Sequence, residues 1–204
     1  MTTVIATLNL EKLGLTLEQF AEFAKDNFWY VEEPKVAWKN HIRDLTTPWN
    51  SVGTIADWKE SAGPFKPGIY ALVYDPANKI CNPILHNQTI IIGETTQSAC
   101  RRLVHHVGAL KGNTTNMSDK YRKHLPKLNE HFGVNLQKEL KNIRILFRPH
   151  DTSDPDWAED RGHSSHMETQ AHAMYYALWK HFPPGNTRDL PSTYLIDRSR
   201  KFLE

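Results

Sequence analysis

Two short apolar runs, each closed by turn residues or glycine, constrain the fold most. Residues 68–74 read Gly-Ile-Tyr-Ala-Leu-Val-Tyr and are followed by Asp-Pro-Ala-Asn at 75–78. Residues 89–92 read Thr-Ile-Ile-Ile and end at Gly93. Runs of this length, rich in β-branched and aromatic residues and bounded by turn formers, are typical of strands. We therefore predict two paired strands joined by a long connection.

The segments after Gly93 predict helices and a third strand. Residues 96–110 carry apolar side chains at helical spacing, and 167–182 are rich in Ala, Met, Tyr, Leu and Trp. Residues 142–148 alternate Ile, Ile and Phe with Arg, which is the period of a strand. The polar and basic stretch 111–126 predicts a loop with one turn of helix at most. The expected fold is α+β, a small three-stranded mixed or antiparallel sheet flanked by helices.

The first 66 residues predict a helical extension. Thr16 and Gln19 have the spacing of a capping box ahead of an amphipathic run, and Pro34 precedes a second helical pattern. Residues 48–67 look like a loop-rich bridge, because prolines and glycines interrupt them. We therefore expect an extension over 1–66 and the main domain over 67–204.

Composition limits the class of protein. The chain of 204 residues is 39% hydrophobic and 24% charged, with no apolar run of the roughly 18 residues that a membrane helix needs. The N-terminus does not show the basic region and following apolar stretch that are typical of a signal peptide. We therefore expect a cytoplasmic protein without a membrane partner. Cys81 and Cys100 are too far apart for a zinc or redox motif, so we expect reduced, structural thiols.

Charge is unevenly distributed although the net charge is only +2. Residues 97–150 hold eleven Lys and Arg against three acids, whereas 151–170 hold six acids and one Arg. This asymmetry predicts a surface that contacts phosphates beside a site for a cation, and solvated loops and helix faces are the alternative. The segment 120–127 interleaves basic residues with Tyr121 and His124, which suits backbone contacts with base stacking. The candidate DNA-backbone contacts are Lys111, Lys120, Arg122, Lys123 and Lys127.

Four elements in one order carry a resemblance to a known family. They are Gly68-Ile69-Tyr70, then Ile91-Ile92-Gly93, then a helix with Arg101 and Arg102, and finally a helix that begins near Glu168. The order and spacing resemble the GIY-YIG nuclease family over about residues 68–186. In that family the two namesake tripeptides lie on neighbouring strands. The first tripeptide is intact here, and Ile91 stands where the family usually has a tyrosine.

The resemblance also implies site residues. The family places an arginine about eight residues after the second glycine and often a histidine four residues later. Arg101 with His105 fits that distance better than Arg102 with His106, and both registers are open. Glu168 corresponds to the metal-binding glutamate, and a late asparagine, Asn186, joins the candidate DNA contacts. Tyr70 as an ordinary strand tyrosine and Glu168 as a first-turn acid are the simpler interpretations.

The implied function is a metal-dependent DNA endonuclease, of a restriction, phage-encoded or repair type, using Mg²⁺ or Mn²⁺. Negative charge builds on the phosphodiester toward its transition state, so an arginine and a divalent cation suit the reaction. The resemblance implies that Tyr70, or water ordered by it, delivers the nucleophile, and His105 is a candidate proton relay.

Two other functions stay open. A catalytically inactive DNA-binding module of the same fold is one, because Ile91 departs from the family pattern. A zinc hydrolase is the other, and its ligands would come from a group near the last helix: His163, His166, Glu168 and His172. A homodimer and a monomer are both compatible with the sequence.

Overall fold

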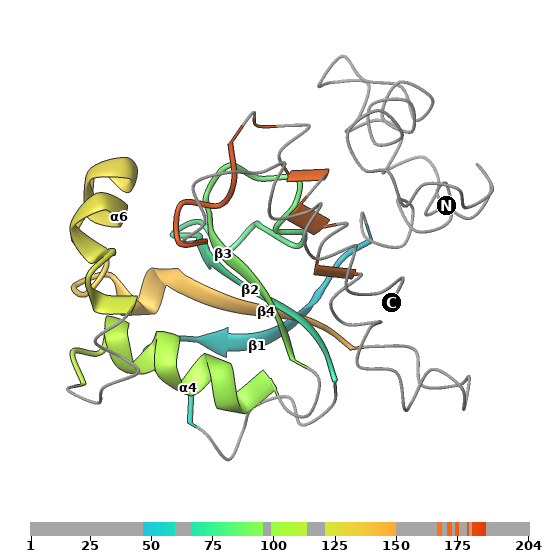
Figure 1. Ribbon diagram of the computed structural model, residues 1–204, viewed down its shortest axis with the longest axis horizontal. Helices are drawn as coiled ribbons and strands as arrows, with labels where there is room; N and C mark the ends of the chain where they lie inside the picture. The colour runs from blue at the N-terminus through green and yellow to red at the C-terminus, as the bar shows by residue number, and fades with distance from the viewer. Residues whose placement is uncertain are drawn as a thin grey trace, which may run out of the picture.

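The computed structural model describes residues 47–59, 67–95, 99–113, 121–149, 167–168, 171–172, 174–175, 179 and 181–186, with the backbone alone at 95 and 99–102. Its centre is one antiparallel sheet in the order β1-β4-β2-β3 (Figure 1). The strands are β1 (Asn50–Thr54), β2 (Gly68–Tyr74), β3 (Thr89–Thr95) and β4 (Ile143–Pro149).

The α+β class and the three predicted strands are confirmed, but the sheet has a fourth strand. β1 lies within the segment expected to be a loop-rich bridge, so that expectation is wrong at 50–54. No residue of β1 is buried; the nearest buried side chains flank it, at Trp49 and Ile55. An edge strand of this kind owes its conformation to pairing with β4 rather than to an apolar pattern of its own.

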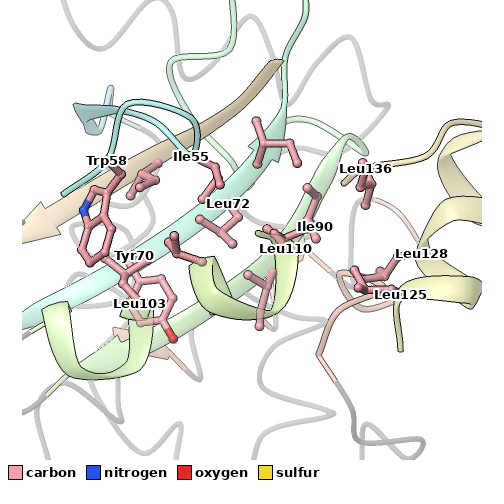
Figure 2. Packing of buried hydrophobic residues seen from close by; sticks show 14 of the residues in the cluster. Ile55, Trp58, Tyr70, Leu72, Ile90, Leu103, Leu110, Leu125, Leu128 and Leu136 are labelled. Carbon is pink, nitrogen blue, oxygen red and sulfur yellow. The ribbon is translucent and has the colours of Figure 1, made fainter. Parts of the chain in front are cut away.

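Strand β2 is one of the two inner strands of the sheet and is buried along six of its seven residues. Tyr70 and Leu72 pair with Phe147 and Ile145 of β4, so these four side chains share one face. They form a hydrophobic cluster with residues of β3, both helices and the segment after β1 (Figure 2).

Two helices contribute to that cluster. Helix α4 (Ala99–Leu110) confirms the prediction for 96–110 and buries Leu103, Val107 and Leu110. Helix α6 (Leu125–Phe132) was not predicted, although Pro126 in its first turn and the spacing of its leucines are helix signals. A 3₁₀ helix, η2 (Leu140–Asn142), leads into β4.

The predicted helix near the C-terminus is confirmed where it is described. Residues 167–168, 171–172, 174–175 and 179 are helical, and the chain bends at His181. The two helices expected in the N-terminal extension lie outside the described residues. Cys81 is a free thiol as expected, but it is exposed rather than part of the core. In the described part of the chain, no helix is both long enough and apolar enough to cross a bilayer.

A nearly buried ion pair ties the long β2–β3 connection to β4. Asp75 accepts hydrogen bonds from Lys79 N–H at 3.0 Å and Ile80 N–H at 2.8 Å, and Arg144 Nη1 lies 2.7 Å from its Oδ2. Arg144 also donates to Ile80 O at 2.9 Å. Burial raises the pKa of Asp75, but the hydrogen bonds and Arg144 outweigh burial and hold it below its usual 3.8. The ionised form of Asp75 therefore stabilises the fold.

We expect Asp75→Asn to lower the free energy of unfolding by about 3 kcal/mol at neutral pH, since it leaves Arg144 without its anion. Because the pKa of Asp75 is lower in the folded state, its contribution is present above pH 3.8 and is lost as pH falls below that value. The difference between wild type and variant in urea unfolding should therefore shrink in acid. Asp57→Asn, at an exposed carboxylate, is the matched control and should change stability by less than about 0.5 kcal/mol. Equal effects of the two substitutions would contradict this account.

Candidate active site

The candidate site begins with a close contact between Tyr70 and Gly93. The two residues face each other across β2 and β3, and Tyr70 is only 1% exposed. A Cβ at position 93 would lie 2.6 Å from both Cζ and Oη of Tyr70, which is closer than side chains approach in proteins. Glycine at 93 is therefore what lets the tyrosine ring lie across β3. Figure 2 shows Tyr70 in the same cluster as Trp58 and Leu103.

Close packing also explains the glycine at position 68. A Cβ at Gly68 would lie 2.3 Å from the carbonyl oxygen of Arg148 and 2.9 Å from the ring of Phe147. The two tripeptides lie on neighbouring strands, as the resemblance implies, with Gly68 opposite Thr95 and Tyr70 opposite Gly93.

His106 of α4 lies beside Tyr70. Their ring centres are 6.0 Å apart, and His106 is 7% exposed. His106 also contacts Tyr121, with ring centres 3.9 Å apart. His105, the expected proton relay, is half-buried at the preceding position of the helix. Of the two histidines, His106 is thus the one that contacts Tyr70 through its ring.

The position of His106 bears on the choice of arginine. Residues 101 and 102 both belong to α4, where 102 precedes 106 by one turn and 101 precedes 105 by one turn. The structure describes the backbone of these two arginines. The spacing therefore links Arg102, rather than Arg101, to the histidine that contacts Tyr70.

Glu168 and His172 lie one turn apart in the last helix, and both are nearly buried, at 5% and 3% exposed. The carbonyl oxygen of Ile92 accepts a hydrogen bond from His172 Nε2 at 3.1 Å. Ile92 precedes Gly93, so the last helix and Tyr70 meet β3 at consecutive residues. Glu168, the expected metal ligand, is thereby placed one helical turn from this meeting point.

The side-chain amide of Asn186 bonds to the edge of β3. Ile92 N–H donates to Asn186 Oδ1 at 3.0 Å, and Asn186 Nδ2 donates to Ile92 O at 2.7 Å. Gly185 N–H donates to Ile90 O at 2.7 Å, which extends the same contact. Both polar groups of Ile92 that β2 leaves unpaired are thus satisfied. Asn186 was expected to contact DNA, and its amide has this structural role.

The expected phosphate contacts divide into several groups. Lys111 places Nζ 3.4 Å from Ala56 O and 3.3 Å from Trp58 O, so it joins α4 to the segment after β1. Arg122 is half-buried, Lys123 is exposed, and Lys120 lies outside the described residues. Among the other described lysines, five side chains are exposed: Lys59, Lys79, Lys127, Lys138 and Lys141.

A mostly apolar pocket adjoins His106. Ile91, the residue that departs from the family pattern, lines it together with His106, Tyr121 and His124. The rest of the wall comes from apolar residues of β2, β3, α4 and α6 and from Gly185. Tyr121 and His124 were expected to stack on bases, and here both line this pocket. Sequence reasoning missed the pairing of Tyr121 with His106, because no local spacing relates α4 to residue 121.

The described residues contain no group of three His, Cys, Asp or Glu side chains placed to hold a metal ion. The expected zinc ligands His163 and His166 lie outside the described residues, and Glu168 with His172 makes only two donors. Magnesium has different needs, since it commonly takes one or two carboxylates and completes its octahedron with water and phosphate oxygens. Glu168 fits Mg²⁺ or Mn²⁺ as a single protein ligand.

No protein-family model, curated protein or solved structure matches this chain.

We expect Gly93→Ala to lower stability by about 2 kcal/mol, because the added methyl group forces the Tyr70 ring from its place. Combining it with Tyr70→Leu should relieve most of that cost, since a leucine has no atoms at the ring's far end. Chemical denaturation of both single variants and the double variant measures this coupling. Additive effects would mean that Tyr70 does not set the need for glycine.

Proposed function

We propose that this protein is a metal-dependent DNA endonuclease of the GIY-YIG type, hydrolysing phosphodiester bonds. The observation that carries the proposal is the placement of Tyr70, held against Gly93 and beside His106. Gly93 is required by close packing against this tyrosine, and Gly68 is required by close packing against Arg148 and Phe147 of β4.

In this proposal Tyr70 and His106 act on the attacking water. A tyrosine has an unperturbed pKa of about 10 and a histidine about 6.5, so His106 is the better proton acceptor near neutral pH. Tyr70 orients the water, and His106 takes its proton. Both residues are nearly buried, and the half-buried ring of Tyr121 lies against His106, so a phosphate reaches them only when neighbouring side chains move.

The positive charge that the transition state needs comes from an arginine of α4 and from the cation. We assign the arginine to Arg102, because it precedes His106 by one helical turn. Glu168 would hold Mg²⁺ or Mn²⁺, and the bound cation would supply charge stabilisation for the phosphoryl oxygens. DNA is the partner, and exposed lysines including Lys123 and Lys127 contact its backbone. A cytoplasmic role in restriction, phage biology or repair accords with this activity.

The proposal predicts different effects for the two adjacent histidines. His106→Ala should lower the rate of plasmid cleavage in Mg²⁺ by about 10²-fold or more, since it removes a proton acceptor. His105→Ala, the matched control on the same helix, should lower it by less than about threefold. The same pattern should hold for Arg102→Ala against Arg101→Ala. A larger loss in the His105 and Arg101 variants would support the other register and contradict this assignment.

A substitution at Glu168 tests whether this residue holds the metal ion. Glu168→Gln keeps the size of the side chain but removes its charge, so we expect cleavage to fall by at least about 10²-fold. Isothermal titration of Mn²⁺ should detect one binding site fewer in the variant. Full cleavage by Glu168→Gln, or unchanged cleavage of wild type in EDTA, would contradict a metal held by Glu168.

A DNA-binding module without catalytic activity is the second candidate. The burial of Tyr70 to 1% exposure and the presence of Ile91 in the pocket beside His106 favour it. This candidate predicts salt-dependent DNA binding by wild type. It also predicts no cleavage of any DNA in Mg²⁺ or Mn²⁺.

A further inference from the structure

Two histidines far apart in the sequence meet at the surface. His131 lies in the last turn of α6, and His181 follows the last helix. Their ring centres are 5.7 Å apart with an angle of 69° between the planes. His131 is exposed and His181 is half-buried, so this histidine pair is open to solvent on one side.

A hydrogen bond to the backbone of the next residue fixes the orientation of the His181 ring. The carbonyl oxygen of Phe182 accepts a hydrogen bond from His181 Nδ1 at 2.7 Å. A carbonyl only accepts, so Nδ1 carries the hydrogen and Nε2 keeps its lone pair. A carbonyl bonded to the far nitrogen is also the arrangement that orients histidine ligands in metal sites.

Aromatic rings surround the histidine pair. Phe132 lies 4.9 Å from His131, and Tyr175 lies 5.7 Å from His181, each measured between ring centres and each edge to face. These contacts restrict how far either imidazole turns.

The separation of the pair suits one bound ion. Two imidazole nitrogens, each about 2.0–2.1 Å from a tetrahedral zinc, place their ring centres roughly 5 Å apart. The observed separation of 5.7 Å is close to this value, and His131 is exposed to solvent. Imidazole nitrogen is a preferred ligand of Zn²⁺, Ni²⁺ and Cu²⁺ and a poor one for Mg²⁺.

We propose that His131 and His181 form a binding site for a late first-row divalent cation such as Zn²⁺, with water completing the coordination. The site is separate from Glu168 and does not depend on the proposed nuclease activity.

The site connects two parts of the fold. His131 belongs to α6, which buries Leu125 and Leu128 in the core. His181 is five residues before Asn186, whose amide bonds to Ile92 of β3. A bound ion would therefore hold the 181–186 segment in place and strengthen its contact with the strand that carries Gly93.

The test compares Zn²⁺ binding by calorimetry in the full chain and in His131→Ala, His181→Ala and the double variant. The chain has eleven histidines, so some background binding is expected and the site is identified by what the variants lose. Each single variant should lose one equivalent of Zn²⁺, or bind it about tenfold more weakly, and the double variant should do no worse than either. His105→Ala is the matched control and should bind as wild type does. His131→Gln repeats the test with a side chain of similar size if an alanine variant fails to fold.

A second measurement detects the effect of the bound ion on the stability of the contact between Asn186 and β3. Zn²⁺ should slow hydrogen exchange of the Ile92 amide, which donates to Asn186, by about threefold or more in wild type and leave it unchanged in the double variant. The same comparison with Mg²⁺ should show no difference between wild type and the double variant, because imidazole is a poor ligand for Mg²⁺. Unchanged Zn²⁺ stoichiometry and affinity in the His131 and His181 variants, or equal protection of the Ile92 amide by Zn²⁺ in wild type and the double variant, would overturn the proposal.

Discussion

The contact between the Tyr70 ring and Gly93 is the constraint on which the rest of the candidate site depends. It fixes a glycine on β3, because any Cβ there would lie 2.6 Å from the tyrosine. It also holds the ring under α4, where His106 lies beside it. Tyr70 belongs to the hydrophobic cluster and is only 1% exposed, so its ring is packed in one orientation and nearly excluded from water. The same packing limits access to the candidate site.

The outer edge of β3 is the second organising feature. An unpaired edge strand exposes backbone groups that favour association with other chains. Here Asn186, Gly185 and His172 bond to the backbone of Ile90 and Ile92. Residues 185–186 therefore cover the outer edge of β3. His172 of the last helix contacts the same edge, and Glu168 lies one helical turn before it. An asparagine at this position has a structural purpose independent of any ligand.

Much of the fold could be predicted from sequence, because strands β2, β3 and β4 and helix α4 carry strong local patterns. Strand β1 could not, since its conformation depends on pairing with β4 across about 90 residues. Helix α6 is only eight residues long and follows a basic stretch, so its few apolar positions are too weak a pattern to predict a helix. The histidine beside Tyr70 could not be chosen either. His105 and His106 differ by one residue in sequence, and only packing against the sheet determines which one faces Tyr70.

The central claim is that Tyr70 takes part in phosphodiester hydrolysis and does not merely fill the core. Tyr70→Phe separates these roles, because it keeps the ring over Gly93 and removes only the hydroxyl group. The most direct measurement is the single-turnover cleavage rate of duplex DNA in Mg²⁺, with the melting temperature of each protein measured in parallel. The account predicts a rate at least about 10²-fold lower in the variant at a temperature where both proteins are folded. Equal rates for the two proteins, or no cleavage by wild type, would contradict it.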